Sequence, residues 1–280
     1  MQNDNLKSYL HLHVIVFIWG FTAVLGKLIS LEALDLVWYR MLFASVIMTF
    51  VVLFNKEKIR VPFNVLIGFI VSGIIIALHW LTFYQAIKVS NVSITLACLS
   101  TGAFFASILE PIFYKRKIIW YEVLFGLIVI FGLGIIFKVE TQYTTGIYLA
   151  VTSAFLSALF SVINGKYAKE YSPNVISVYE LSSGFLFLSI YLFFADSFTP
   201  AFFALSSNDL LWLFFFNLYG LCIFGICQSN EVFKPIYSNA YHQFRTYLWN
   251  HFSASNFSRK RENVAHVLHW CNHNFSDCYC

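Results

Sequence analysis

The chain has 280 residues, of which 59% are hydrophobic, 20% aromatic and only 11% charged. A typical soluble domain has about 25% charged residues, and a soluble fold of this size could not bury so much apolar surface. The net charge of +4 does not indicate a nucleic-acid partner, because the basic residues lie in short loops beside apolar stretches. The composition excludes a soluble globular protein and predicts an all-α polytopic membrane protein.

Eight stretches without Asp, Glu, Lys or Arg follow one another along the chain. They are Leu10–Gly26, Met41–Phe54, Val61–Ile87, Val89–Leu109, Val123–Phe137, Thr141–Gly165, Leu181–Ala195 and Leu210–Gln228. A helix needs about 20 mostly apolar residues to cross a bilayer. The stretches therefore predict about eight transmembrane helices. Residues 1–9 are polar and of mixed charge, so no cleavable signal peptide is expected.

The loops between these stretches alternate in charge. Nine basic residues lie before the first stretch and in every second loop: Lys7, Lys56, Lys58, Arg60, Lys115, Arg116, Lys117, Lys166 and Lys169. The intervening loops hold Lys27, Lys88 and Lys138 together with most of the acidic loop residues. Because basic loops stay in the cytoplasm, the pattern predicts a multi-pass protein of the cytoplasmic (inner) membrane with its N-terminus inside.

Two parts of the chain repeat one another. Phe21–Lys27 (F-T-A-V-L-G-K) matches Phe160–Lys166 (F-S-V-I-N-G-K), and Val37–Arg40 (V-W-Y-R) matches Ser177–Glu180 (S-V-Y-E). Five predicted spans separate the matching helices, so the two copies run in opposite directions. Inverted repeats of this kind are typical of transporters. The repeat predicts a first five-helix unit at 1–140, an incomplete second unit of about three helices at 141–227, and an atypical polar tail at 228–280.

Three motifs carry a resemblance to a known family. They are I-W-G-F-T-A-V-L-G-K at Ile18–Lys27, W-Y-R at Trp38–Arg40, and S-T-G-A-F-F-A-S-I-L-E-P at Ser100–Pro111, followed by the basic loop Lys115–Lys117. With these motifs the chain resembles the EamA-like branch of the drug/metabolite transporter superfamily. The resemblance implies ten helices in a five-plus-five inverted repeat and carriage of a small metabolite or drug-like solute. It says nothing of the substrate.

The tail departs from this family pattern. A second Leu-Glu-Pro and two further spans would be expected, but residues 228–280 contain five of the eight histidines and no apolar run long enough to cross. Shifting the codons of Gln243–Thr246 by one base permits Asn-Leu-Glu-Pro, which predicts a frameshift or truncation near residues 223–227. His266, His269, Cys271, His273, Cys278 and Cys280 do not follow the spacing of a closed zinc site, so neither a metal nor a cofactor is expected.

Ionisable and aromatic residues within the spans are the candidates for a substrate pathway, since charges are costly in lipid. The candidates are Trp19, Arg40, His79, Trp80, Tyr84, Asn91, Thr95, Glu110 and Glu180. Trp80 and Tyr84 share a helix face and could line an aromatic pocket, and Trp19 could face the same cavity. Asn91 and Thr95 would add polar groups.

Four of these candidates have a structural alternative. Arg40 could hold an anionic substrate group or reach to the interface, and Glu180, at the matching repeat position, could pair with it across the two halves. His79 could relay protons, although a hydrogen-bonding role in packing is favoured. Glu110 could couple protons, but Pro111 and the nearby charges favour a helix-end partner for Lys115–Lys117.

The interpretation is a permease whose partners are the lipid bilayer and a small-molecule solute. No catalytic triad or phosphate loop is present, so the chain is not expected to be an enzyme, and no nucleic-acid partner is expected. With two helices missing, transport by the chain as written would be weak or absent unless a second copy, in a homodimer, completed the bundle. Two alternatives stay open: a non-functional truncated membrane protein, and a membrane regulator with a cytosolic metal-binding tail.

Overall fold

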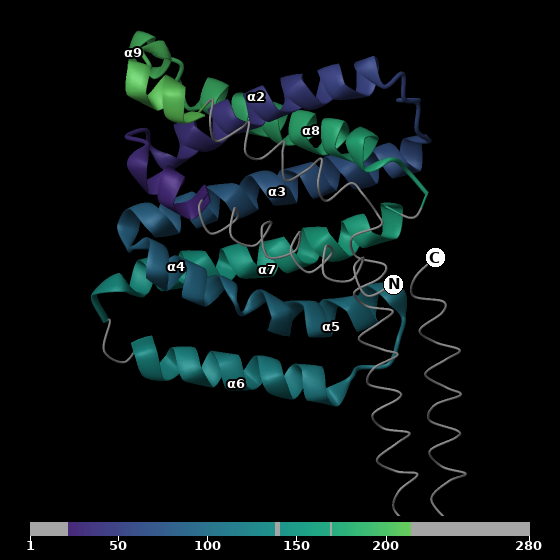
Figure 1. Cartoon of the computed structure of the whole chain (residues 1–280), viewed down its shortest axis with the longest axis vertical. Helices are drawn as coiled ribbons and strands as arrows, with labels where there is room; N and C mark the ends of the chain where they lie inside the picture. Colours follow the sequence, from purple (N-terminus) through teal and green to yellow (C-terminus); the bar gives the residue numbers. More distant parts are fainter. Residues whose placement is uncertain (1–21, 138–140, 169, 214–280) are drawn as a thin grey trace, which may run out of the picture. The chain divides into compact units, whose positions relative to one another are not determined.

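The computed structural model describes residues 22–137, 141–168 and 170–213 (Figure 1). The helices in order are α2 (Ala33–Phe54), α3 (Phe63–Val89), α4 (Val92–Leu99), α5 (Gly102–Tyr114), α6 (Trp120–Phe137), α7 (Thr144–Tyr167), α8 (Pro173–Phe194) and α9 (Pro200–Phe203). A 3₁₀ turn, η1 (Thr141–Tyr143), precedes α7. Residues 22–28 and 207–213 are also helical.

Within the part of the chain that the structure describes, five helical segments are long and apolar enough to cross a membrane: Ala33–Phe54, Phe63–Val89, Val92–Tyr114, Thr144–Tyr167 and Pro173–Phe194. Trp120–Ile135 in α6 is a shorter apolar helix. The all-α, multi-pass membrane architecture is thereby confirmed. Residues 22–28 and 207–213 overlap the predicted first and eighth spans, which are Leu10–Gly26 and Leu210–Gln228. The rest of those spans, the polar tail and the proposed shift site lie outside the described residues.

Two helices begin before the charge-free stretches that they contain. The helix α2 begins at Ala33 and α8 begins at Pro173, whereas the stretches begin at Met41 and Leu181. Both helices run through charged residues, namely Asp35 and Arg40 in α2 and Glu180 in α8. A charge-free stretch therefore marked only the part of each helix beyond its charged turns.

The predicted fourth span is interrupted. Turn residues Ser100 and Thr101 separate α4 from α5, and both hydroxyls donate to backbone carbonyl oxygens one turn earlier, on Ala97 and Cys98. Such local bonds let Ser and Thr compete with helical hydrogen bonding. The span is thus built from two helical pieces.

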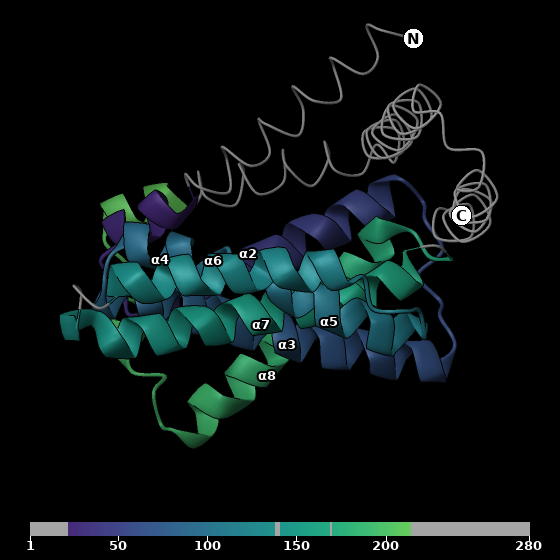
Figure 2. The same cartoon turned by 90° about the horizontal axis from the view of Figure 1, so that it is seen from below.

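The long helices pack side by side in the order α2, α8, α3, α7, α5, α6 (Figure 1). Figure 2, seen from below, shows that α8 is inclined to α7. We name the two ends of this bundle by their loops. The basic end holds loops 55–62 and 115–119 and residues 170–172, and the opposite end holds loops 29–32 and 90–91 and the segment 195–206, which contains α9. The helices α2 and α8, which carry the matching motifs, are antiparallel, as an inverted repeat requires.

A close crossing between α3 and α8 lies inside this bundle. Gly73 of α3 packs so tightly that a Cβ there would collide with the backbone of Glu180 and with Ser183. On the other side, a Cβ at Gly184 would come within 2.8 Å of both the Gly73 carbonyl oxygen and Met41. Small residues allow helices in lipid to approach in this manner. The crossing fixes α8 against α3 next to the most buried carboxyl group of α8.

Candidate functional site

Three of the predicted pathway residues come together between α2 and α3. The Arg40 Nη1 atom donates to the Tyr84 hydroxyl at 2.5 Å. The guanidinium carbon of Arg40 lies 3.9 Å from the centroid of the Trp80 ring and 5.3 Å from that of Tyr84. A cation over an aromatic face is attracted by the ring quadrupole, and a desolvated contact contributes about 2 kcal/mol. We call Arg40, Trp80 and Tyr84 the arginine cluster.

The arginine cluster lies in the half of the bundle nearer the opposite end. Arg40 is seven residues from the start of α2, and Tyr84 is five residues from the end of α3. Tyr84 is fully buried, and a Cβ at Gly26 would come within 2.6 Å of Cδ1 of the Tyr84 ring. The Gly-Lys motif of the first repeat unit therefore packs directly on this cluster.

A second polar group forms around Glu180 on α8, which is 3% exposed. Its Oε2 atom accepts a hydrogen bond of 3.0 Å from Asn164 Nδ2 on α7. Asn164 Oδ1 in turn accepts a 2.8 Å bond from the Ser72 hydroxyl on α3. Glu180 Oε1 has no hydrogen-bond partner among the described residues. We call Ser72, Asn164 and Glu180 the carboxyl network.

The hydrogen bonds of Arg40 and Glu180 lead to different partners, Tyr84 and Asn164. Each residue lies seven positions into its helix, but α2 and α8 start at opposite ends of the bundle. At 1.5 Å per residue each therefore lies about 10 Å from its own end. An inverted repeat places matching residues at mirrored depths, so these two charges face opposite ends of the protein.

His79 joins α3 to α7. Its Nδ1 atom lies 2.8 Å from the Ser153 carbonyl oxygen and 2.9 Å from the Ser153 hydroxyl, and that hydroxyl lies 3.1 Å from the His79 carbonyl oxygen. Ser153 is fully buried, so these hydrogen bonds join α3 to α7 away from water. The geometry favours the packing role of His79 over the relay.

The remaining candidates lie away from both groups or outside the described residues. Asn91 caps α4 by accepting from the Ile94 amide at 2.9 Å, and the buried Thr95 donates to the Asn91 carbonyl oxygen at 2.9 Å. Glu110 forms a 2.5 Å ion pair with Arg116 at the basic end, where its side chain is 40% exposed. This geometry favours the helix-end role of Glu110. Trp19 lies outside the described residues.

Sequence reasoning missed a carboxylate that joins the two repeat units at the basic end. Glu57, in the loop after α2, accepts from Asn174 Nδ2 at 2.5 Å and also from the Ser172 hydroxyl. Ser172 and Asn174 form the start of α8. Burial would raise the pKa of Glu57, but hydrogen bonds from Ser172, Asn174 and Asn55 outweigh it and hold the pKa below 4.5. The signal was present, since Glu57 is an acidic residue between Lys56 and Lys58 in an otherwise basic loop.

A second missed carboxylate lies at the opposite end. Asp209 is 4% exposed and accepts from the Ser30 amide at 2.8 Å, the Ser30 hydroxyl at 2.7 Å and the Ser206 hydroxyl at 2.6 Å. Burial would raise the pKa of Asp209, but the bonds from Ser206 and Ser30, together with Lys88, hold it below 3.8. The spacing Ser-x-x-Asp at 206–209 is that of a capping box and could have predicted the helix start.

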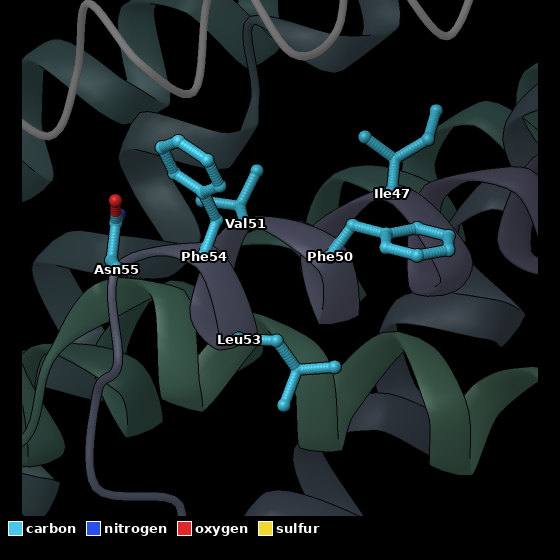
Figure 3. A pocket seen from close by; sticks show the side chains of 6 residues that line it. All are labelled: Ile47, Phe50, Val51, Leu53, Phe54 and Asn55. Atoms are coloured by element: carbon cyan, nitrogen blue, oxygen red, sulfur yellow. The ribbon is translucent and has the colours of Figure 1, made fainter.

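The surface also carries an apolar hollow at the basic end of α2. It is lined by Ile47, Phe50, Val51, Leu53, Phe54 and Asn55, and Figure 3 shows these side chains along the last turns of α2. Phe50 and Phe54 are 68% and 89% exposed, as suits a face in contact with lipid. None of the candidate pathway residues lines this hollow.

Comparison with known proteins identifies the first part of the chain. Residues 6–138 match the EamA-like transporter family. No curated protein and no solved structure matched the chain significantly. The family match covers α2 to α6 and contains the arginine cluster. Residues 6–138 are therefore similar to the EamA-like transporter family, and the chain is a multi-pass, transporter-like integral membrane protein.

Proposed function

We propose that this protein is a permease that moves a small amphipathic metabolite or drug-like solute across the cytoplasmic membrane, with its N-terminus inside. The arginine cluster carries the proposal. It places a cation and two aromatic rings within apolar helices of an EamA-like segment.

The chemistry of the arginine cluster favours a solute with an anionic group beside an aromatic or apolar body. A guanidinium presents a planar set of donors that fits a carboxylate in two parallel hydrogen bonds. Trp80 and Tyr84 offer apolar faces next to that charge. A few polar groups within aromatic walls are typical of sites for small molecules.

Uptake into liposomes tests this proposal. The purified full chain is reconstituted, and uptake of radiolabelled phenylacetate is compared with that of the uncharged phenylacetamide. We expect wild-type protein to take up the carboxylate preferentially. Arg40→Gln should reduce that uptake at least tenfold, because the side chain keeps some polarity but loses its charge and its planar fork.

Arg60→Gln is the matched control, since Arg60 is exposed in the loop before α3 and the chemical change is identical. This variant should transport as the wild type does. An absence of uptake for either probe by a folded, reconstituted chain would contradict the carrier and favour the truncated, non-transporting alternative. Equal uptake by Arg40→Gln and wild type would show that the arginine cluster does not bind the solute.

A further inference from the structure

In the carboxyl network, the buried Glu180 carboxyl group is not paired with a cation, and one of its oxygen atoms accepts no hydrogen bond from the described residues. Glu180 is 3% exposed, and its Oε2 atom is bonded to a neutral amide rather than to a cation. Its Oε1 atom has no hydrogen-bond partner among the described residues. The close packing of Gly73 and Gly184 on either side keeps this region of α8 tightly enclosed.

The free-energy cost of burying Glu180 differs strongly between its ionised and its neutral form. An ionised carboxylate buried without a cation costs several kcal/mol, and the interior of a membrane adds to that penalty. A neutral carboxylic acid with one unsatisfied polar atom costs about 1–3 kcal/mol. The neutral acid is therefore the form that fits this packing.

Four titratable groups on α2, α3, α7 and α8 have contacts with residues other than Glu180. On α2, Arg40 binds Tyr84 beyond the crossing. On α3, His79 binds Ser153 and lies two turns past Ser72. On α7, the Tyr167 ring packs against Phe69, and on α8 itself the Tyr179 hydroxyl donates to the Ile59 carbonyl oxygen. The polar side chain that bonds to the Glu180 carboxyl is that of Asn164, and Ser72 donates in turn to Asn164.

We infer that Glu180 is a proton-binding site in the half of the membrane nearer the basic end, with Asn164 and Ser72 as its positioning residues. The proton is held on the Glu180 carboxyl in the packed conformation described here. It leaves to water at the basic end when α8 separates from α3 and α7. Coupling of this proton to solute movement rests on the proposed permease function, whereas proton binding itself does not.

Infrared difference spectroscopy on the purified full chain tests the proton site without transport. We expect a protonated-carboxyl C=O band at neutral pH that disappears on alkaline titration. Glu180→Gln should abolish this band, and Glu110→Gln, which removes an exposed ion-paired carboxylate, should leave it unchanged. Asn164→Leu removes the hydrogen bond to Oε2, so it should move the band to higher frequency. That second variant keeps the test decisive if Glu180→Gln fails to fold.

Reconstituted vesicles test the coupling separately. An imposed pH gradient should drive phenylacetate accumulation in the wild type. Glu180→Gln should lower that accumulation at least tenfold while preserving exchange of labelled for unlabelled phenylacetate. The assignment of Glu180 is overturned if the band persists in Glu180→Gln or stays at its wild-type frequency in Asn164→Leu. A band that behaves as expected in a chain that moves no solute would support the proton site and contradict the permease.

Discussion

The Glu57 carboxylate and the Asn174 amide are joined by a 2.5 Å hydrogen bond across 117 positions of sequence. Glu57 follows the last turn of α2, and Asn174 lies in the first turn of α8. The bond therefore links the loop of one repeat unit to the helix start of the other at the basic end. A carboxylate at a helix N-terminus also interacts favourably with the helix dipole.

Replacing Glu57 should weaken the contact between the loop after α2 and the start of α8, and so lower the free energy of unfolding. In Glu57→Gln the amide can still accept a hydrogen bond, but the charge that strengthens the bonds from Ser172 and Asn174 is lost. Because the site is only half-buried, we expect a loss of about 1 kcal/mol. Thermal unfolding in detergent, followed by circular dichroism, would measure it. Glu170→Gln, an exposed glutamate at the same end, is the control and should unfold as the wild type does.

The Glu57 link should also depend on pH in a defined direction. The pKa of Glu57 is held below its ordinary value of 4.5 in the folded protein, so protonation favours the unfolded state. The stabilisation is complete above about pH 4.5 and is lost as the pH falls through the lower folded pKa. Melting temperatures of wild type and Glu57→Gln should therefore converge on acidification. A gap that widened at low pH would contradict this sign.

The Asp209 contact should contribute more to the free energy of unfolding than the Glu57 contact does. Asp209→Ala removes an acceptor of three hydrogen bonds, one of them from the Ser30 backbone amide. We expect a loss of about 2–3 kcal/mol. Asp196→Asn is the control, since Asp196 is exposed and asparagine tolerates its positive φ of 51°. Comparable melting temperatures for the two variants would show that the contact contributes little.

The sequence alone predicted the membrane class and the apolar helices, because each depends on patterns local to one segment. The resemblance at Ile18–Lys27 and Ser100–Pro111 predicted the family that residues 6–138 match. Trp80 and Tyr84 could be placed on one face by their spacing of four, which is a property of any helix. That Arg40 lies over Trp80 depends on how α2 packs on α3, which spacing does not specify.

The carboxyl network could not be predicted for the same reason. Ser72, Asn164 and Glu180 come from three helices, and α8 meets α3 where Gly73 and Gly184 allow it. The hypothesis that Arg40 pairs with Glu180 was based on their matching repeat positions. It did not consider how deep each residue lies in the bundle. The charge-free stretches also left out the first turns of α2 and α8, because those turns contain charged residues.

The Gly73 crossing gives the most direct test of this packing. Gly73→Ala places a methyl group against the Glu180 backbone and Ser183, so α3 and α8 must separate. Overpacking of this kind costs about 1–3 kcal/mol, which exceeds the gain of up to about 1 kcal/mol from replacing a helical glycine with alanine. Gly132→Ala in α6 is the matched control, because a Cβ there has no neighbour within 4 Å among the described residues. We expect Gly132→Ala to unfold at or above the wild-type temperature and Gly73→Ala to unfold below it, both measured in detergent by circular dichroism. If Gly73→Ala were as stable as Gly132→Ala, α3 and α8 could not be in contact at Gly73. Glu180 would then not be enclosed by that contact.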